Sequence, residues 1–327
     1  MDDDATIPDW RRTDAPIRIG VSSCLLGNEV RFDGGHKRDA FLTQELAPFV
    51  EWVPVCPEVE VGMGIPRPTV RLVRLASGVR MIAERSGHDY TDAMETWSEK
   101  RLRTLRRLEL GGFVLKKDSP SCGMERVRIY DRGMPTRIGR GLFADRLLAE
   151  LPSLPIEEEG RLNDPLLREN FVERLFAYRR VRQLFAGRWR PRDLIEFHTA
   201  HKLQLLAHSP TAYRELGRLV ARVKELPRGE LGPTYETAFM AALTRRATRK
   251  RHVNVLQHMA GYFRNLADAA DRAELARLID DYGAGLVPLI VPITLIQHHV
   301  RRSGVSYLAD QIYLAPHPKE LMLRNHV

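Results

Sequence analysis

The chain has 327 residues, of which 43% are hydrophobic and 28% are charged, a composition typical of globular proteins. No segment approaches the ~18 consecutive apolar residues of a membrane span, and the acidic start Met-Asp-Asp-Asp is unlike a signal peptide. We therefore expect a cytoplasmic protein with reduced thiols and no membrane association. The net charge of +9 is uneven, because residues 151–327 carry 27 Lys and Arg against 19 Asp and Glu. A basic second half suggests contact with a polyanion, although an arginine-rich genome would produce the same bias.

The first half alternates short strands with helices. We expect residues 1–15 to be flexible. Strands are predicted at 18–22, 51–55 and 113–115, with a hairpin over 69–83 that turns at Ser77-Gly78. Helices are predicted over 38–48, 90–108 and 141–151. This order favours a Rossmann-like α/β fold with a largely parallel sheet, in which ligands collect beyond the carboxyl ends of the strands.

From about residue 163 the pattern becomes helical, with very little strand signal. Apolar residues recur at helical spacing in six segments: 166–185, 194–206, 210–224, 233–263, 272–282 and 287–301. The proline-flanked residues 152–155 and the acidic residues 157–160 are interpreted as a linker. The sequence therefore predicts an α/β domain over 16–155, followed by an all-α domain over 156–327.

The chain has three cysteines, and each lies in a short segment that follows a predicted strand. They are Cys24 in Ser-Ser-Cys-Leu-Leu-Gly, Cys56 in Pro-Val-Cys-Pro-Glu-Val and Cys122 in Ser-Pro-Ser-Cys-Gly. An odd number of thiols does not form a simple disulfide framework. Three converging thiolates can hold three corners of a [4Fe–4S] cluster and leave the fourth iron open for chemistry. Two alternatives stay open: a zinc site, which would need a fourth ligand such as His36, and three unrelated buried thiols.

Polar side chains flank the cysteines at short offsets. Glu58 lies two residues after Cys56, so in an extended segment its carboxylate would share the side of the thiolate and serve as a general acid or base. Ser119 and Ser121 precede Cys122, and their hydroxyls can donate to cluster sulfur or to a bound heterocycle. A turn-capping carboxylate and turn-forming serines are the structural alternatives. Further candidates for cluster or substrate contacts are Ser22, Ser23, Arg31, Asp33 and Lys37.

These motifs together resemble the TudS family of thiouracil desulfidases over about residues 16–155. The resemblance also rests on Val-Arg-Phe-Asp-Gly at 30–34 and Gly-x-Gly-x-Pro-Arg-Pro at 62–68. It implies that Cys24, Cys56 and Cys122 bind a [4Fe–4S] cluster whose fourth iron takes the sulfur of the substrate. It further implies that Glu58 and Ser119 are the catalytic carboxylate and serine.

The second half resembles the helical YbgA-like domain. The residues that carry this resemblance are Phe-His-Thr-Ala-His-Lys at 197–202, His-Ser-Pro at 208–210 and Lys-Arg-His-Val-Asn-Val-Leu-Gln-His at 250–258. A desulfidase domain joined to that domain resembles the RudS-type enzymes, which implies removal of sulfur from 4-thiouridine in tRNA. The expected RNA contacts form a basic run: Arg245, Arg246, Arg249, Lys250, Arg251 and His252. Tyr262 and Phe263 are candidates to stack on bases; a solvated helix face and a helical core are the structural alternatives.

We therefore predict a hydrolytic desulfidase that acts on 4-thiouridine in tRNA by a Lewis-acid mechanism without redox change. Glu58, supported by Ser119, would activate the attacking water. Two alternatives remain: a desulfidase of free thiouracil, and a cluster-bearing nucleic-acid-binding sensor that would not need Glu58. The sequence leaves the oligomeric state open.

Overall fold

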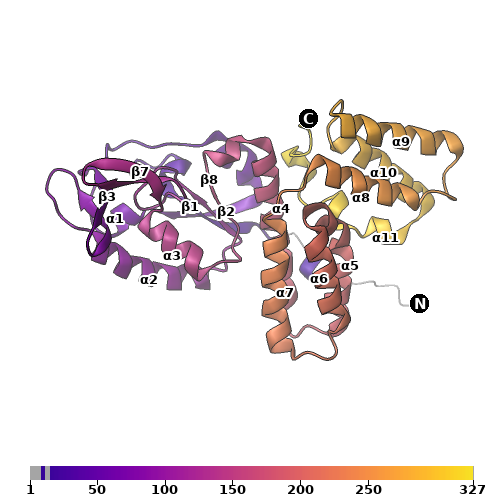
Figure 1. The fold of residues 1–327 in the computed structure, drawn as a ribbon, viewed down its shortest axis with the longest axis horizontal. Coiled ribbons are helices and arrows are strands. Elements are labelled where there is room, and N and C mark those ends of the chain that lie inside the picture. The colour runs from indigo at the N-terminus through magenta and orange to yellow at the C-terminus, as the bar shows by residue number, and fades with distance from the viewer. Residues whose placement is uncertain (1–8, 12–14, 327) are drawn as a thin grey trace. The chain divides into compact units, whose positions relative to one another are not determined.

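The structure, a computed structural model, describes residues 9–11 and 15–326 of the chain (Figure 1). It divides into two compact units, one formed by residues 13–164 and the other by residues 1–12 together with 165–327. The predicted α/β first region and all-α second region are confirmed. The division falls at residue 164 rather than at 155.

The predicted flexible segment, residues 1–15, lies mostly outside the described residues. Within it, Asp9–Arg11 form a 3₁₀ turn (η1) that belongs to the second unit. Trp10 is 3% exposed, and its ring meets the Phe197 ring edge-on with centroids 5.1 Å apart. Aromatic pairs of this geometry add to the stabilisation that burial gives. The turn η1 is therefore anchored in the second unit.

A four-stranded parallel sheet lies at the centre of the first unit. Its strands follow the order β2 (Val50–Val55), β1 (Ile17–Ser22), β5 (Gly112–Leu115) and β8 (Ile156–Glu158). Ser22 lies opposite Val55, and Val21 opposite Val114, so β1, β2 and β5 end at nearly the same level. Because the strands are parallel, the segments that carry the three cysteines all leave the sheet at one edge, as predicted.

A second four-stranded sheet has the order β4-β3-β6-β7. The predicted hairpin is confirmed as β3 (Val70–Leu75) paired antiparallel with β4 (Gly78–Ala83). The other hairpin, β6 (Val127–Asp131) and β7 (Met134–Gly139), was not predicted. Five of the six residues of β7 are exposed, so its sequence lacks the apolar alternation by which a half-buried strand is identified.

The two longer helices of the first unit, α2 (Thr91–Arg107) and α3 (Leu142–Glu150), occur where the sequence predicts them. The short α1 (Pro57–Glu60) was not predicted. The helix predicted over 38–48 is a π-helical segment, η3 (Phe41–Leu46), followed by a 3₁₀ turn, η4 (Ala47–Phe49). Two more 3₁₀ turns, η2 (Ser23–Leu26) and η5 (Arg161–Asn163), follow β1 and β8.

The predicted linker at 152–160 is wrong, because its acidic residues belong to the parallel sheet. β8 is buried along its length, including the side chains of Glu157 and Glu158. Each carboxylate has a partner inside the unit: Glu157 accepts from Arg161 Nε at 2.6 Å, and Glu158 accepts from the Met124 N–H at 2.6 Å. Buried charges are stable when they are paired in this way. The partner of Glu157 is only four residues away, whereas that of Glu158 lies 34 residues earlier, where no local pattern shows it.

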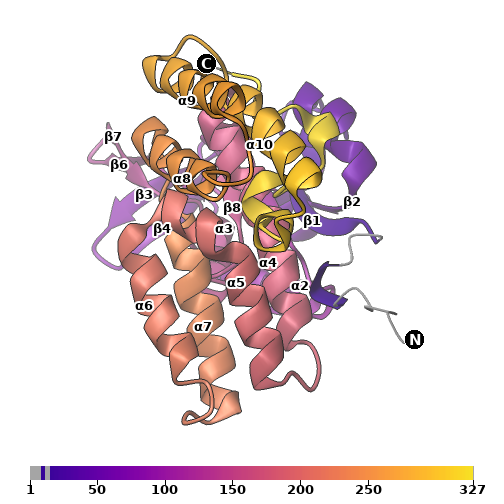
Figure 2. The ribbon, with the colours of Figure 1, turned by 90° about the vertical axis from the view of Figure 1, so that its right-hand side faces the viewer.

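The second unit is helical and includes seven long helices (Figure 2). These are α4 (Pro165–Phe185), α5 (Pro191–His208), α6 (Pro210–Ala221), α7 (Arg228–Leu243), α8 (Arg249–Gly261), α9 (Ala269–Ala284) and α10 (Ile290–Ser303). Shorter turns complete it: α11 (Ser306–Ala309), η6 (Ile312–Leu314) and η7 (Lys319–Leu321). Among the helices described, none has the length and apolar content needed to cross a membrane.

The single helix predicted over 233–263 is wrong, because the chain forms two helices there. α7 ends at Leu243 and α8 begins at Arg249. Thr248 caps α8: its hydroxyl accepts a hydrogen bond from the Arg251 N–H at 3.3 Å. Satisfying a free N–H of the first turn favours a new helix start at this point. The basic run predicted to contact RNA is therefore divided between a turn and the start of α8.

Candidate active site: a pocket lined by three thiols

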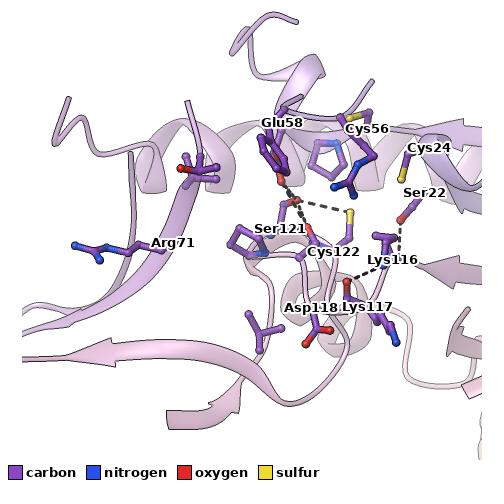
Figure 3. A pocket seen from close by; sticks show the side chains of 18 of the residues that line it. Ser22, Cys24, Cys56, Glu58, Arg71, Lys116, Lys117, Asp118, Ser121 and Cys122 are labelled. Atoms are coloured by element: carbon purple, nitrogen blue, oxygen red, sulfur yellow. Dashed lines mark hydrogen bonds between the residues drawn. The ribbon is translucent and has the colours of Figure 1, made fainter. Parts of the chain in front are cut away.

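The three cysteines line one pocket of about 530 Å³ in the first unit. Cys24 follows β1 in the turn η2, Cys56 follows β2 and precedes α1, and Cys122 lies in the loop after β5. All three are free thiols. Figure 3 shows their side chains reaching a common space from three separate segments. The prediction that the cysteines converge is confirmed, and the alternative of three unrelated buried thiols does not describe this arrangement.

Burial keeps these thiols protonated. It raises the pKa of Cys24 to about 11 and raises the pKa of Cys122 further, and the nearby Cys56 adds to the rise at both. The pKa of Cys56 is also raised by burial. A cysteine binds metal as the thiolate. Metal binding by these three cysteines would therefore release their protons, and the positive charge of the metal would stabilise thiolates that burial alone disfavours.

The donor set fits an iron–sulfur cluster better than a single metal ion. Across residues 9–11 and 15–326, no three His, Cys, Asp or Glu side chains gather closely enough to hold one ion. A tetrahedral zinc site would require such a group. Three soft thiols around a wider hollow, without a fourth protein ligand, match a cluster with one open iron.

Glu58 faces the pocket from the helical turn α1, not from the extended segment that the sequence suggested. Pro57 starts this turn, and Glu58 is its second residue. The Glu58 carboxylate accepts two hydrogen bonds from one guanidinium: Arg67 Nε at 2.9 Å and Nη2 at 2.7 Å, both to Oε2. This pair is nearly buried, with the side chains 4% exposed for Arg67 and 13% for Glu58. The second oxygen, Oε1, remains directed toward the serines of the Cys122 loop.

Arg67 is a site residue that sequence reasoning missed. Its Nη1 also donates to the carbonyl oxygens of Val30 at 2.9 Å and Gly64 at 3.2 Å. One guanidinium therefore joins the segment after Cys24, the segment after α1 and the carboxylate of Glu58. The only signal in the sequence was the Gly-x-Gly-x-Pro-Arg-Pro motif at 62–68, which does not show that its arginine reaches Glu58.

The two serines of the Cys122 loop both approach Glu58 Oε1, at different distances. Ser121 Oγ donates to Glu58 Oε1 at 2.8 Å and lies 3.7 Å from Cys122 Sγ (Figure 3). Ser119 Oγ lies 3.5 Å from Glu58 Oε1 and accepts from the Cys122 N–H at 3.1 Å. Both hydroxyls are 2.9 Å apart. Ser119, the predicted catalytic serine, thus shapes the loop around Cys122, whereas Ser121 makes the shorter contact with the carboxylate.

The remaining candidates in the first unit also lie near the pocket. Ser22 Oγ accepts from the Lys116 N–H at 2.9 Å and so ties the end of β1 to the end of β5. Ser23, Arg31 and Lys37 line the pocket. Asp33 is outside the lining, and its carboxylate pairs with the Arg31 guanidinium at 3.3 Å.

The pocket wall is basic, although the first half of the chain is nearly neutral. Seven basic and three acidic side chains line it. The acidic ones are Glu58, Glu84 and Asp118, and the basic ones are Arg31, Lys37, Arg67, Arg71, Lys116, Lys117 and Arg128. In the part of the chain that the structure describes, four of these cations have no ion-pair partner: Lys37, Arg71, Lys117 and Arg128. The Arg71 guanidinium lies over the Tyr130 ring, 5.0 Å from its centroid.

The residues of the predicted RNA-binding run differ in exposure. Arg245, Arg246, Arg249 and Lys250 are exposed, whereas Arg251 is half-buried and donates to the His208 carbonyl at 2.7 Å. His252 is buried, as a core position of α8 would be: its Nδ1 lies 2.8 Å from the Tyr313 hydroxyl. Burial lowers the pKa of His252 to about 3, so it offers no positive charge to a phosphate.

The aromatic and histidine candidates of the second unit belong mostly to its core. Phe263 is fully buried, while Tyr262 is partly exposed and stacks on Tyr307. His198 and His201 are buried: the first lies 3.0 Å from the Tyr235 hydroxyl, and the second lies 2.8 Å from a backbone carbonyl. Each ring is therefore partnered at Nδ1 only, because the Nε2 atoms of both histidines are buried without a hydrogen-bond partner among the described residues.

Comparisons with known proteins cover both units. The family model of 2-thiouracil desulfurase matches residues 19–159, and that of DUF1722, a protein family of unknown function, matches residues 202–318. The uncharacterized protein YbgA of Escherichia coli (strain K12) is 33% identical over 153 residues, which are 46% of this chain and 90% of YbgA. The uncharacterized protein YbbK of Bacillus subtilis (strain 168) is 31% identical over 153 residues, which are 45% of this chain and 99% of YbbK.

Among solved structures, the [4Fe-4S]-dependent thiouracil desulfidase TudS is similar to this chain. The two are 30% identical, with a TM-score of 0.38, and the match covers 48% of this chain and 99% of that one. The family matches fall within the two units that the fold defines. The chain therefore belongs to the 2-thiouracil desulfurase family in its first unit and to the DUF1722 family of YbgA in its second.

Proposed function

We propose that this protein removes sulfur from a thiolated pyrimidine, with 4-thiouridine in tRNA as its substrate. The observation that carries the proposal is the convergence of three free thiols and Glu58 on one pocket. Membership of the 2-thiouracil desulfurase family in this unit supports the same reaction class. Water replaces sulfur in the reaction: a C–O bond forms, the C–S bond breaks, and hydrosulfide leaves without net electron transfer.

Cys24, Cys56 and Cys122 would hold a [4Fe–4S] cluster, which supplies a Lewis-acidic iron for the thiocarbonyl sulfur when bound. Glu58 would accept a proton from the attacking water through Oε1, the oxygen that Arg67 does not bind. Ser121 donates to the same oxygen and would hold the carboxylate in position. Two N–H groups of Arg67 hold Oε2 while Ser121 holds Oε1, so both carboxylate oxygens are fixed and Oε1 stays directed to the pocket.

A nucleotide suits this pocket better than a free base does. Free thiouracil carries no phosphate. The pocket wall, in contrast, has more basic than acidic side chains and includes four cations without an ion-pair partner among the described residues. Phosphate contacts of lysine and arginine make binding steeply salt-dependent. The exposed cations before and at the start of α8, Arg245, Arg246, Arg249 and Lys250, would add contacts along the RNA backbone.

The experiment that tests the proposal compares substrates under one set of conditions. The full chain is reconstituted anaerobically with iron and sulfide, then incubated with 4-thiouridine-containing tRNA, 4-thiouridine monophosphate and free 2-thiouracil. We expect conversion of thiouridine to uridine in tRNA, with a rate that falls steeply as salt increases. Glu58→Gln and Cys24→Ala should each abolish it, while the surface variant Arg74→Ala should not.

Three outcomes contradict parts of the proposal. Turnover of free thiouracil alone, insensitive to salt, would assign the protein to the small-molecule substrate. Absence of turnover by a four-iron protein on all three substrates would favour a sensor. Full activity of Cys24→Ala would refute the site itself.

The double variant Lys117→Ala with Arg128→Ala should lower the salt dependence of tRNA turnover, by about one unit of slope for each phosphate that the variant no longer binds.

A further inference from the structure

The second unit contains a separate hollow of about 640 Å³. Residues of α4, α8 and α9 line it, and its wall combines buried carboxylates with exposed arginines. Its size lies within the range of small-molecule sites in proteins. The proposed function uses two of its lining residues, Arg246 and Arg249, as contacts to the RNA backbone, but assigns no role to the hollow itself.

The carboxylates of this hollow are already matched by buried cations. Glu173 lies 3.1 Å from His208 Nε2, and it also accepts from Gln204 at 2.8 Å. Glu169 accepts from Arg324 Nε at 3.0 Å. Glu173 raises the pKa of His208, which favours the charged imidazolium beside the carboxylate. The floor of the hollow is therefore close to neutral, and its carboxylates are not available for a metal ion or an amine.

The arginines at the hollow lack such partners. Arg246 and Arg249 line it and are exposed, and among the described residues no carboxylate pairs with either guanidinium. The Arg249 guanidinium is held in place by its neighbours: it lies over Tyr282, 5.9 Å from the ring centroid, and fills the space that a side chain at Gly285 would occupy. Gly285 has a φ of 79°, which also favours glycine.

A buried histidine offers a donor into the same hollow. His252 lines the hollow, and its Nδ1 contacts the Tyr313 hydroxyl at 2.8 Å. When the Tyr313 hydroxyl donates to Nδ1, the proton of the neutral imidazole is on Nε2. No described residue accepts a hydrogen bond from this Nε2–H group. The first N–H groups of α8, at Arg249 and Lys250, begin a 13-residue helix whose positive dipole end attracts anions.

From these contacts we infer that the hollow binds one nucleotide of RNA, with its phosphate between Arg246, Arg249 and the start of α8 and its nucleoside beside Tyr282 and His252. The two unmatched guanidinium groups suit the charge of a phosphate. Tyr282 is 6% exposed and the Arg249 guanidinium already lies over its ring, so the base is held by the His252 donor, which suits a carbonyl group, and not by stacking on that ring. The choice of RNA as the source of the nucleotide rests on the proposed function.

The test measures binding by the full chain and does not depend on turnover. Uridine 5′-monophosphate, uridine and inorganic phosphate are titrated by calorimetry, and uridine 5′-monophosphate is then used to displace labelled tRNA. We expect the monophosphate to bind more tightly than either fragment and to displace tRNA. The double variant Arg246→Ala with Arg249→Ala should weaken both interactions by roughly ten-fold or more, the loss of at least one charge-assisted hydrogen bond.

Two further variants control this test. Gly285→Ala keeps both arginines but places a methyl group where the Arg249 guanidinium lies, so it should also weaken binding. Arg301→Ala removes an exposed arginine of α10. This residue lies about 18 Å along the helix from Leu289, a lining residue of the hollow, so the variant should bind the monophosphate as the parent does. Circular dichroism confirms that each variant is folded.

The outcomes separate this inference from the proposed function. Parent-like binding by the double arginine variant would refute the site, and so would inorganic phosphate binding as tightly as the nucleotide. Failure of the bound monophosphate to displace tRNA would refute RNA as the source. A protein that binds the nucleotide here but desulfurates no substrate would refute the proposed function and leave this site standing.

Discussion

Replacing Arg67 by alanine tests the site at its most buried contact. The substitution removes four hydrogen bonds, two to Glu58 and one each to the carbonyls of Val30 and Gly64. It leaves the Glu58 carboxylate, 13% exposed, without its cation. Breaking a buried pair in this way costs about 3–5 kcal/mol. Because Ser121 still donates to Glu58 at 2.8 Å, we expect the lower end, about 3 kcal/mol.

The stability of the first unit can be measured by urea unfolding and calorimetry. A loss of about 3 kcal/mol lowers the melting temperature of a domain of this size by roughly 6–12 °C. The double variant Arg67→Ala with Glu58→Gln removes the unpaired charge as well, so part of the loss should be recovered. Arg74→Ala, an exposed arginine of β3 outside the pocket, should change stability by no more than about 0.5 kcal/mol.

Activity gives an independent measure of the same contact. If Arg67 holds Glu58 in place for proton transfer, Arg67→Ala should lower kcat by about a hundred-fold, and the double variant should lose no more than Glu58→Gln alone. Groups that act as one unit show this non-additive behaviour. Strictly additive losses in stability and in kcat, or an Arg67→Ala variant with parent-like kcat, would refute the coupling.

Two further predictions concern the cysteine loop and the second unit. In Gly123→Ala the new methyl group would lie 2.9 Å from the Ser119 carbonyl oxygen, so the loop must shift and iron content per chain after reconstitution should fall; parent-like iron content would contradict this. Burial lowers the pKa of His198 to about 4 and of His252 to about 3, so their stabilising neutral forms are fully effective above pH 6.5 and are lost as the pH falls. Burial also lowers the pKa of His201, and that of His317 to about 4, so both histidines act in the same direction. Glu169, whose pKa burial raises to about 7, opposes them in part. Urea unfolding should therefore show a net loss of stability between pH 7 and pH 5, and greater stability at pH 5 would contradict the sign.

Local patterns predicted the elements that position the thiols. The sequences of β1, β2 and β5 have the pattern of short apolar strands, each followed by a Gly-, Pro- or Ser-rich segment. The parallel arrangement brings those three segments to one edge of the sheet. Glu58 was predicted beside the thiols for the wrong local reason, since the turn α1 and not an extended strand brings it there. The position of Glu58 near the thiols was predictable because a side chain two residues after Cys56 stays close to it in any backbone conformation.

Features that depend on distant partners were not predictable. Nothing local shows that Arg67 reaches a carboxylate nine residues earlier and a carbonyl 37 residues earlier. The acidic residues of β8 resemble a solvated linker because their partners, such as Met124, lie elsewhere in the chain. The break between α7 and α8 depends on the Thr248 cap, a single hydrogen bond that competes with continuous helical periodicity.

The charge of the pocket shows why a net charge over half a chain is a weak guide to a binding site. Residues 1–150 contain 24 Lys and Arg and 23 Asp and Glu, which suggested that only the second half would meet a polyanion. Many of those acids pair with arginines outside the pocket, for example Glu99 with Arg146 at 2.7 Å and Glu51 with Arg18 at 2.9 Å. The wall of the thiol pocket therefore keeps an excess of basic side chains. If that excess binds substrate phosphate, turnover of 4-thiouridine monophosphate must itself slow with added salt, even though a mononucleotide is too small to report on an extended RNA-binding surface.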